Sequence, residues 1–272
     1  MVKAGSIFSI CAHNLRKWLI NPRIYVVFIT ASLYLHSILS PILIFCKNSG
    51  HNISLYVFPF IMSHTNSVTL IMLGVILLFC DAPFIEIDQP YIIMRSGRKV
   101  WTLGQILYIL IASFIYFFFI LAFSCLILLP HIEFGMEWGK VIGTFAQTSV
   151  APQHNIVIPF SFSIYNAYLP IVAMILSFLN CFLISFILGM LIFMLNLNFS
   201  RFTGVVVAAL LVFWQAAVTK TWTGFTKFSP VSWVSLARID TTASTLYPTQ
   251  QYIYIAQPVK EPPILPWQNR GF

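Results

Sequence analysis

Residues 100–132 read VWTLGQILYILIASFIYFFFILAFSCLILLPHI, a long run without a single Asp, Glu, Lys or Arg. The hydrocarbon core of a bilayer is about 30 Å thick, and a helix needs roughly 20 apolar residues to cross it. This run exceeds that length. It therefore predicts a membrane-spanning helix.

Similar runs recur on both sides of this stretch. Only 8% of the residues are charged and 59% are hydrophobic, whereas soluble domains carry about a quarter charged residues. The sequence predicts an all-α, polytopic helical membrane protein with about five transmembrane helices. We expect spans near residues 24–45, 61–80, 104–129, 169–195 and 202–219. The second is the weakest, because His64 and Asn66 lie in its first turns.

The N-terminal residues 5–20, GSIFSICAHNLRKWLI, predict an amphipathic helix. At about 100° per residue, one side is apolar and the other polar. The apolar side holds Ile7, Phe8, Ile10, Cys11, Leu15, Trp18 and Leu19, and the polar side holds Ser6, Ser9, His13, Arg16 and Lys17. Such a helix lies in the interface of the lipid bilayer with its apolar face down. The first span follows without a small-residue cleavage site, so we expect no removable signal peptide.

The basic residues indicate how the chain is oriented. Connections on one side of the predicted spans hold Lys3, Arg16, Lys17, Arg23, Arg95, Arg98, Lys99 and Arg201, and those on the other side hold Lys47 and Lys140. This excess places the N-terminus in the cytoplasm and the protein in the cell membrane. The net charge of +8 is then a positive-inside bias with contact to anionic headgroups, and we expect no nucleic-acid partner.

The connection between the second and third spans is unusually rich in charge. Asp81-Ala-Pro83 is typical of a helix start. Glu86 and Asp88 favour the positive end of a helix, and Arg95 and Arg98 the negative end. Gly97 offers a turn before the next span. The pattern predicts a short helical element in the cytosol, although a solvated turn fits the same residues.

The opposite connection, residues 131–168, is too long for a simple turn and predicts an extracytoplasmic excursion. Within it GMEWGKVIGTFAQ (135–147) predicts an interfacial helix anchored by Trp138. The following APQHNIVIPFS (151–161) is predicted to be irregular.

Several kinds of chemistry are missing from the sequence. It holds no P-loop motif, no H-E-x-x-H and no recognisable Ser/His/Asp spacing. The predicted spans carry no charge in their interior, which argues against a proton- or sodium-coupled transporter. The five cysteines show no C-x-x-C spacing and are expected to be small core residues. Ser177, Asn180 and Ser185 are expected to form hydrogen bonds between helices.

The stretch DAPFIEIDQPYIIMRSGRKVWTLGQILYI (81–109) resembles the region between the second and third spans of ABC-2-type transporter permeases from Gram-positive bacteria. These are membrane subunits of ABC exporters, with lantibiotic-immunity and multidrug relatives. The matching features are Asp81-x-Pro83-Phe84, R-S-G-R at 95–98, Trp101 and Gly104-Gln105. The resemblance extends over the N-terminal helix, EFGMEWGKVIGTFAQT (133–148) and SPVSWVSLARID (229–240).

This resemblance implies a permease subunit rather than an enzyme, with no cofactor on this chain. ATP and Mg²⁺ would be bound by a separate ABC ATPase subunit, on which two permease subunits assemble as a homo- or heterodimer. The charged connection would be a coupling helix seated in the ATPase. Its expected docking residues are Asp81, Pro83, Glu86, Asp88, Gln89, Arg95, Gly97 and Arg98. The cargo would be hydrophobic or amphipathic, and its identity stays open.

The C-terminal part departs from the family pattern of six spans. Residues 241–272, TTASTLYPTQQYIYIAQPVKEPPILPWQNRGF, contain no apolar run near 20 residues, and their prolines exclude a regular helix. We expect one permease transmembrane domain over 1–240 and an atypical tail over 241–272. A sixth span lost by truncation or frameshift and a natural five-span variant both fit. The alternatives to an active permease are a membrane scaffold or sensor, or a truncated, transport-incompetent permease.

Overall fold

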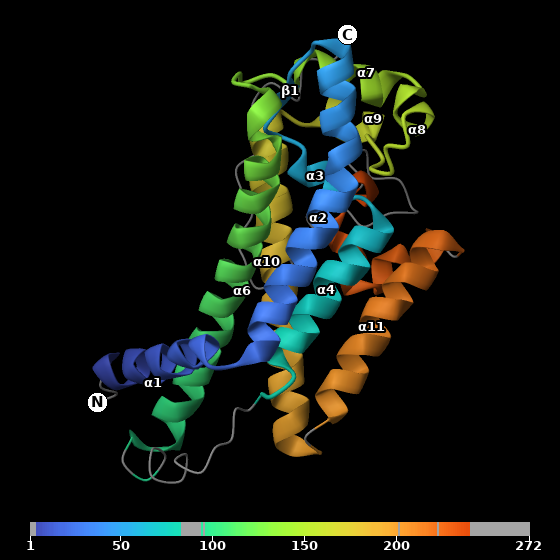
Figure 1. Cartoon of the computed structure of the whole chain (residues 1–272). Helices are drawn as coiled ribbons and strands as arrows, with labels where there is room; N and C mark the ends of the chain where they lie inside the picture. The colour runs from blue at the N-terminus through green and yellow to red at the C-terminus, as the bar shows by residue number, and fades with distance from the viewer. Residues whose placement is uncertain (1–3, 83–93, 95, 201, 222, 240–272) are drawn as a thin grey trace, which may run out of the picture.

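The computed structural model describes residues 4–82, 94, 96–200, 202–221 and 223–239. Long helices dominate this part of the chain (Figure 1). They are α1 (Ala4–Arg16), α2 (Pro22–Ser49), α4 (Thr65–Phe79), α6 (Arg98–Leu128), α10 (Pro170–Asn198) and α11 (Thr203–Lys220). Residues 83–93, which hold most of the predicted coupling element, and the tail 241–272 lie outside the described residues.

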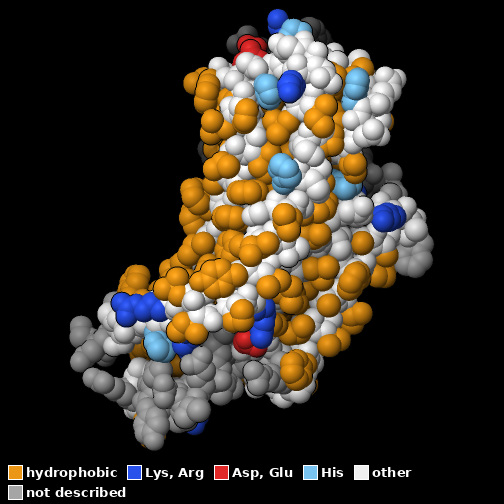
Figure 2. All heavy atoms as spheres, in the orientation of Figure 1, with side chains coloured by type: hydrophobic (Ala, Val, Ile, Leu, Met, Phe, Trp, Pro, Cys, Tyr) orange, Lys and Arg blue, Asp and Glu red, His pale blue; other side chains and the backbone are white. Residues whose placement is uncertain are grey.

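The long helices form an elongated bundle, and α1 lies across one of its ends (Figure 1). We call this the α1 end. The opposite end carries α7 (Gly139–Gln147), α8 (Val150–Gln153) and α9 (Phe162–Ala167), and we call it the α7 end. Hydrophobic side chains cover the middle of the visible face, and most charged side chains gather toward the two ends (Figure 2).

Four described helices are long and apolar enough to cross a membrane: α2, α6 with the 3-10 turn that follows it, α10 and α11. They correspond to the first, third, fourth and fifth predicted spans. Each buries one side in the bundle and exposes large apolar side chains on the other, as in α2, where Leu35 is buried and Leu33 is exposed. The prediction of a polytopic, all-α membrane protein is confirmed at this level.

The second predicted span, 61–80, does not form one long helix. Its helix α4 has 15 residues, which reach about 22 Å. The short helix α3 (Phe58–Ile61) precedes it, and the helical conformation is interrupted between α3 and α4. Strand β1 (Ile53–Ser54) pairs in parallel with β2 (Ile132–Glu133), which follows α6 at the α7 end. Residues 53–79 thus pass through the bundle as two helices with a break.

The break has a local cause. His64 is the N-cap residue of α4 and adopts an extended backbone conformation. Its Nδ1 is 2.9 Å from the hydroxyl of Ser67. The polar residues that weakened this span in the sequence mark the point where the helix is interrupted.

After α11 the chain folds back into the bundle instead of leaving it. Residues 223–239 form three 3-10 helices, η3 (Thr223–Phe228), η4 (Pro230–Val234) and η5 (Leu236–Arg238), which we call the return segment. Val231, Val234 and Leu236 are buried, and η4 packs against α10 and α11. Nη2 of Arg238 donates to the hydroxyl of Thr65 at 3.0 Å, which ties the segment to the start of α4.

The predicted helix in the excursion is present as α7. Its predicted anchor, Trp138, is buried in the protein, and its indole N–H donates to the carbonyl of Tyr168 at 3.1 Å. The stretch predicted to be irregular, 151–161, is only partly so, because α8 covers its first residues. Trp138 therefore fixes the excursion onto the bundle itself.

Candidate functional site

At the α1 end, short hydrogen bonds join the N-terminal helix to α6. Helix α1 packs mainly against the first turns of α6. Nδ2 of Asn14 donates to Oε1 of Gln105 at 2.7 Å. The indole N–H of Trp18 donates to the hydroxyl of Tyr108 at 2.9 Å. These two bonds fix α1 and the 3-10 helix that follows it, η1 (Lys17–Leu19), in one register along α6.

The close approach of α1 and α6 requires a glycine. A Cβ atom at Gly104 would lie 2.8 Å from Cγ2 and 2.9 Å from Cβ of Ile10. Both distances are shorter than real side chains tolerate, so a larger residue would push the helices apart. Gly104-Gln105 was singled out in the sequence as a matching motif, and the structure gives both residues a packing role.

The face of α1 that meets the bundle differs in part from the predicted apolar face. Ile10 and Cys11 are buried as expected, whereas Phe8 is 62% exposed. Asn14 is buried although it was not assigned to that face. Burial raises the pKa of the Cys11 thiol. Arg16 is exposed and Lys17 half-buried.

Arg23, at the start of α2, forms an ion pair across the bundle. Its Nη1 lies 2.6 Å from Oδ2 of Asp81, just beyond the end of α4. The same nitrogen donates to the sulfur of Cys80 at 2.7 Å. The side chains of Arg23 and Asp81 are 41% and 36% exposed, so water screens the pair and its net contribution to stability is small.

Cys80 supports this arrangement as a neutral thiol. Burial, followed by the nearby charge of Asp81, raises the pKa of its thiol above the usual range, although Arg23 acts in the opposite direction. The thiol also donates to the carbonyl of Leu77 at 3.1 Å. Cys80 therefore accepts the hydrogen bond from Arg23 as an uncharged thiol.

A buried asparagine holds the next residue of the chain. Nδ2 of Asn196, near the end of α10, donates to the carbonyl of Ala82 at 2.7 Å. Its Oδ1 accepts from the backbone N–H of Gly204 at 2.7 Å, at the start of α11. One amide thus satisfies the carbonyl of Ala82 and an N–H of a helix start. A Cβ atom at Gly204 would lie 2.6 Å from the carbonyl oxygen of Ile192, so α10 and α11 meet with almost no space.

Together these contacts hold the point where the charged connection leaves α4. Arg23 of α2 binds Asp81, and Asn196 of α10 binds Ala82 while it also binds α11. We call Arg23, Asp81, Ala82, Asn196 and Gly204 the root clamp. The connection therefore starts from a position tied to three long helices.

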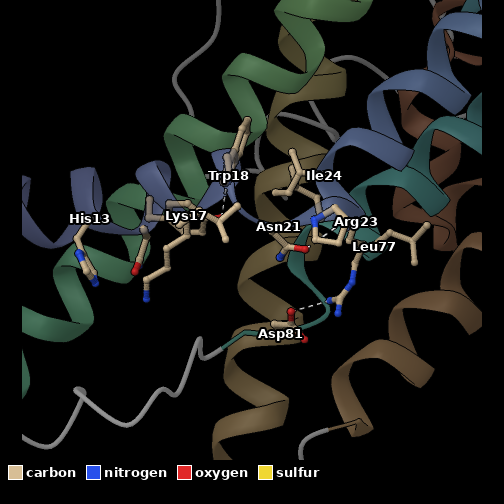
Figure 3. A pocket seen from close by; sticks show the side chains of 13 residues that line it. His13, Lys17, Trp18, Asn21, Arg23, Ile24, Leu77 and Asp81 are labelled. Carbon is tan, nitrogen blue, oxygen red and sulfur yellow. Dashed lines mark hydrogen bonds and ion pairs between the residues drawn. The ribbon is translucent and has the colours of Figure 1, made fainter.

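A pocket of about 560 Å³ lies beside the root clamp, between α1, the start of α2 and the end of α4 (Figure 3). Its charged lining residues are His13, Lys17, Arg23 and Asp81. In Figure 3 the side chains of His13 in α1 and Lys17 in η1 extend toward the side on which Arg23 meets Asp81. Among the described residues no group of three or more His, Cys, Asp and Glu could hold a metal ion.

The structure places the predicted docking residues as follows. Asp81 lies in the root clamp, and Arg98 is the first residue of α6. Gly97 precedes α6 with a φ of 84°, a left-handed conformation that favours glycine, as the predicted turn requires. Pro83, Glu86, Asp88, Gln89 and Arg95 lie outside the described residues. A helix over this connection and its docking role stay predictions.

Sequence reasoning missed most partners in the site. Arg23 was assigned only to the positive-inside bias, Gln105 was identified only as part of a matching motif, and Asn14 and Asn196 were not singled out. The available signal was a carboxamide within an apolar run, because such a group is costly to bury without a partner. The signal marks the residue but not its partner, which depends on how the helices align.

The predicted polar contacts in the middle of α10 are confirmed in part. The hydroxyl of Ser185 donates to that of Ser113 on α6 at 3.1 Å. Nδ2 of Asn180 contacts the carbonyl of Trp233 in the return segment, at 3.5 Å. Oδ1 of Asn180 and Oγ of Ser177 have no hydrogen-bond partner among the described residues. All five cysteines are free. Cys11, Cys46 and Cys181 are buried, as predicted for core residues, whereas Cys80 and Cys125 are only partly buried.

No protein-family model, curated protein or solved structure matches the chain. The fold and the contacts above are therefore the basis for any functional assignment.

Proposed function

We propose that the chain is the membrane-spanning permease subunit of an ABC-2-type exporter. Two permease subunits would assemble on two ATPase subunits, which bind ATP and Mg²⁺. The cargo would be hydrophobic or amphipathic. In this proposal the chain supplies the path across the cell membrane and the element that receives movement from the ATPase.

The root clamp is the observation that supports this proposal best. An element that transmits force must not pivot freely where it joins the membrane helices. Arg23 of α2 binds Asp81, and Asn196 of α10 binds Ala82. Asn196 also binds the first turn of α11. A displacement of the connection would therefore move three helices together.

The second attachment of the connection lies at the start of α6. Residues 98–108 carry the contacts with α1 and η1, through Gln105 and Tyr108 respectively. Closure of the ATPase pair would pull on both ends of the connection, and α1 would follow α6. Rigid movement of packed helices is an established way to switch a membrane protein between two states.

The basic side chains support a cytoplasmic α1 end. That end carries Arg16, Lys17, Arg23, Arg98 and Lys99 in the described part of the chain. The connections between long helices at the opposite end carry only Lys47 and Lys140. Lys220, Lys227 and Arg238 lie at the end of α11 and in the return segment, which folds back into the bundle. Under the positive-inside rule, this difference supports a cytoplasmic position for the N-terminus, the root clamp and the charged connection.

The second permease subunit would bind the face made by α2, α4 and α11. Helix α4 packs against both α2 and α11 and lies between them (Figure 1). Large apolar side chains are exposed on both flanking helices, among them Ile29 and Leu33 of α2 and Leu210 and Phe213 of α11. In the proposed dimer the cargo would pass along this face.

Charge reversal in the connection tests the docking role. We would express the tagged chain with Glu86→Lys plus Asp88→Lys, or with Arg95→Glu plus Arg98→Glu. Each double variant should insert into the membrane but lose an ABC-type ATPase during purification, since the docking surface would repel its partner. ATPase peptides in the purified complex, identified by mass spectrometry, are the readout.

A matched double variant, Glu133→Lys plus Glu137→Lys, makes the same charge change at the α7 end and should leave the complex intact. Topology must be checked in the arginine variant, because it also removes positive-inside charge. A normal ATPase yield with both connection variants would rule out docking and favour a scaffold or sensor.

A further inference from the structure

The pocket beside the root clamp has the position of an interfacial site. Helix α1 lies across the bundle, and the pocket fills the corner between α1 and the first residues of α2 (Figures 1 and 3). The charge-free run of α2 starts at Ile24, which lines the pocket. The pocket therefore sits where the hydrocarbon core of a bilayer would meet its headgroups.

The charges of the pocket favour an anion. Its described lining holds two permanently cationic side chains, Lys17 and Arg23, against one carboxylate, that of Asp81. Counted over these three described side chains, the formal charge is +1.

Arg23 has hydrogen-bond donors to spare. A guanidinium carries five N–H groups, and the described contacts of the Arg23 side chain with Asp81 and Cys80 use Nη1 alone. The N–H groups on Nε and Nη2 remain, and the side chain is 41% exposed. A guanidinium suits the oxygens of a phosphate group because it presents parallel N–H bonds.

The rim of the pocket is apolar and open. Ile20 is 84% exposed and Leu77 is 46% exposed, and both line the pocket. Tyr25, Val26 and Ile29 continue an exposed strip along α2, away from the α1 end. A ligand with a charged head in the pocket could lay a hydrocarbon chain along this strip.

From these observations we propose that the pocket binds the phosphate headgroup of an anionic phospholipid. Arg23 and Lys17 would hold the phosphate, and the acyl chains would run along α2. A cationic pocket between helices at a membrane surface is a recognised type of headgroup site. The bound lipid would link α1 to the root clamp, whether or not the chain is a permease subunit.

Native mass spectrometry of the detergent-purified chain tests this proposal. The chain would be equilibrated with equal amounts of phosphatidylglycerol and phosphatidylcholine, and retained lipids counted. The wild type should retain phosphatidylglycerol preferentially. Lys17→Gln and Arg23→Gln should each reduce that preference about fivefold, because each removes one cationic contact.

Two further variants test whether removing negative charge increases lipid retention and provide a control for the net charge. Asp81→Asn removes the competing carboxylate and should increase phosphatidylglycerol retention. Arg16→Gln changes the same net charge on the neighbouring exposed residue, which does not line the pocket, and should retain lipid like the wild type. Added inorganic phosphate should not displace the lipid, because the acyl chains contribute to binding.

Several results would overturn the proposal. They are equal retention of the two lipids by the wild type, an equal loss with Arg16→Gln and Lys17→Gln, a loss with Asp81→Asn, and displacement by inorganic phosphate. Thermal unfolding in phosphatidylcholine would be measured for each variant, and a loss of lipid in a variant that unfolds like the wild type supports the pocket directly.

Discussion

Helix α10 carries two buried asparagines that are used in opposite ways. Asn196, at the α1 end, makes two hydrogen bonds of 2.7 Å, to Ala82 and from Gly204. Asn180, nearer the α7 end, makes one contact of 3.5 Å, and its oxygen has no partner among the described residues. The same residue type on one helix thus marks a tightly held end and a loosely held one.

The wider surroundings follow the same division. At the α1 end the chain is held by an ion pair, short amide bonds and glycine contacts. Toward the α7 end, the return segment is held mainly by buried apolar side chains such as Val231 and Val234, and the hydroxyls of Ser229 and Ser235 have no described partner. Polar contacts thus position the charged connection, while apolar burial holds the return segment within the bundle.

The largest expected difference in stability is between variants of the two asparagines, Asn196 and Asn180. Asn196→Leu would leave a buried carbonyl and a buried N–H unpaired, each of which costs about 1–3 kcal/mol. Asn180→Leu removes a weak contact and an unsatisfied oxygen, so its cost should be near zero. Thermal unfolding of both variants in the same detergent measures the difference. Equal destabilisation would show that the two ends are held alike.

The glycines give a second comparison of the two ends. Gly204→Ala would bring a Cβ atom within 2.6 Å of a backbone oxygen, and overpacking of this kind costs about 1–3 kcal/mol. Gly143→Ala, in α7, would meet only the end of the Tyr165 side chain, at 3.3 Å, and should cost much less. The melting temperatures of the two variants decide between these expectations, and a larger loss for Gly143→Ala would reverse the comparison.

The packing of α1 on α6 can be tested through Cys11. Burial raises the pKa of this thiol, so the reactive thiolate forms only at a higher pH than usual. Gly104→Leu should separate α1 from α6, lower that pKa toward its ordinary value and raise the rate of maleimide labelling by on the order of tenfold near neutral pH. Labelling of a chain with Cys11 as its single cysteine gives the rate and its pH dependence. An unchanged rate would mean that Gly104 does not control the contact.

The smallest effect is expected at the ion pair. Arg23→Gln should lower the free energy of unfolding by less than about 1 kcal/mol, because both partners are more than a third exposed to water. Raised salt concentration should shrink the difference from the wild type further. A loss as large as that of Asn196→Leu would mean that the pair, rather than the amide, holds the connection.

Composition and periodicity predicted the helical membrane architecture and most of the helices, because each long apolar run must satisfy its own backbone. They also predicted α1, because its apolar and polar residues separate onto two sides at helical spacing. The interruption at His64 was foreshadowed by polar residues in the second run. The return segment was not predicted as part of the bundle, since Val231 and Trp233 are buried through contacts with distant helices.

The candidate site was predicted less completely than the fold. Asp81 and Gly97 were identified from local charge and turn patterns. The partners Arg23 and Asn196 were not, because they are separated from Asp81 and Ala82 by a large part of the chain. Their pairing depends on the relative register of α2, α4 and α10, which no local pattern contains.

The proposed function requires that the root clamp position the charged connection for an ATPase. The most direct measurement is the amount of ABC-type ATPase that co-purifies with the tagged chain from the cells that naturally produce it. We predict that the wild type and Asn180→Leu retain the ATPase and that Asn196→Leu loses it while remaining inserted in the membrane. Absence of an ABC-type ATPase from the wild-type preparation, or equal retention by Asn196→Leu, would contradict this account.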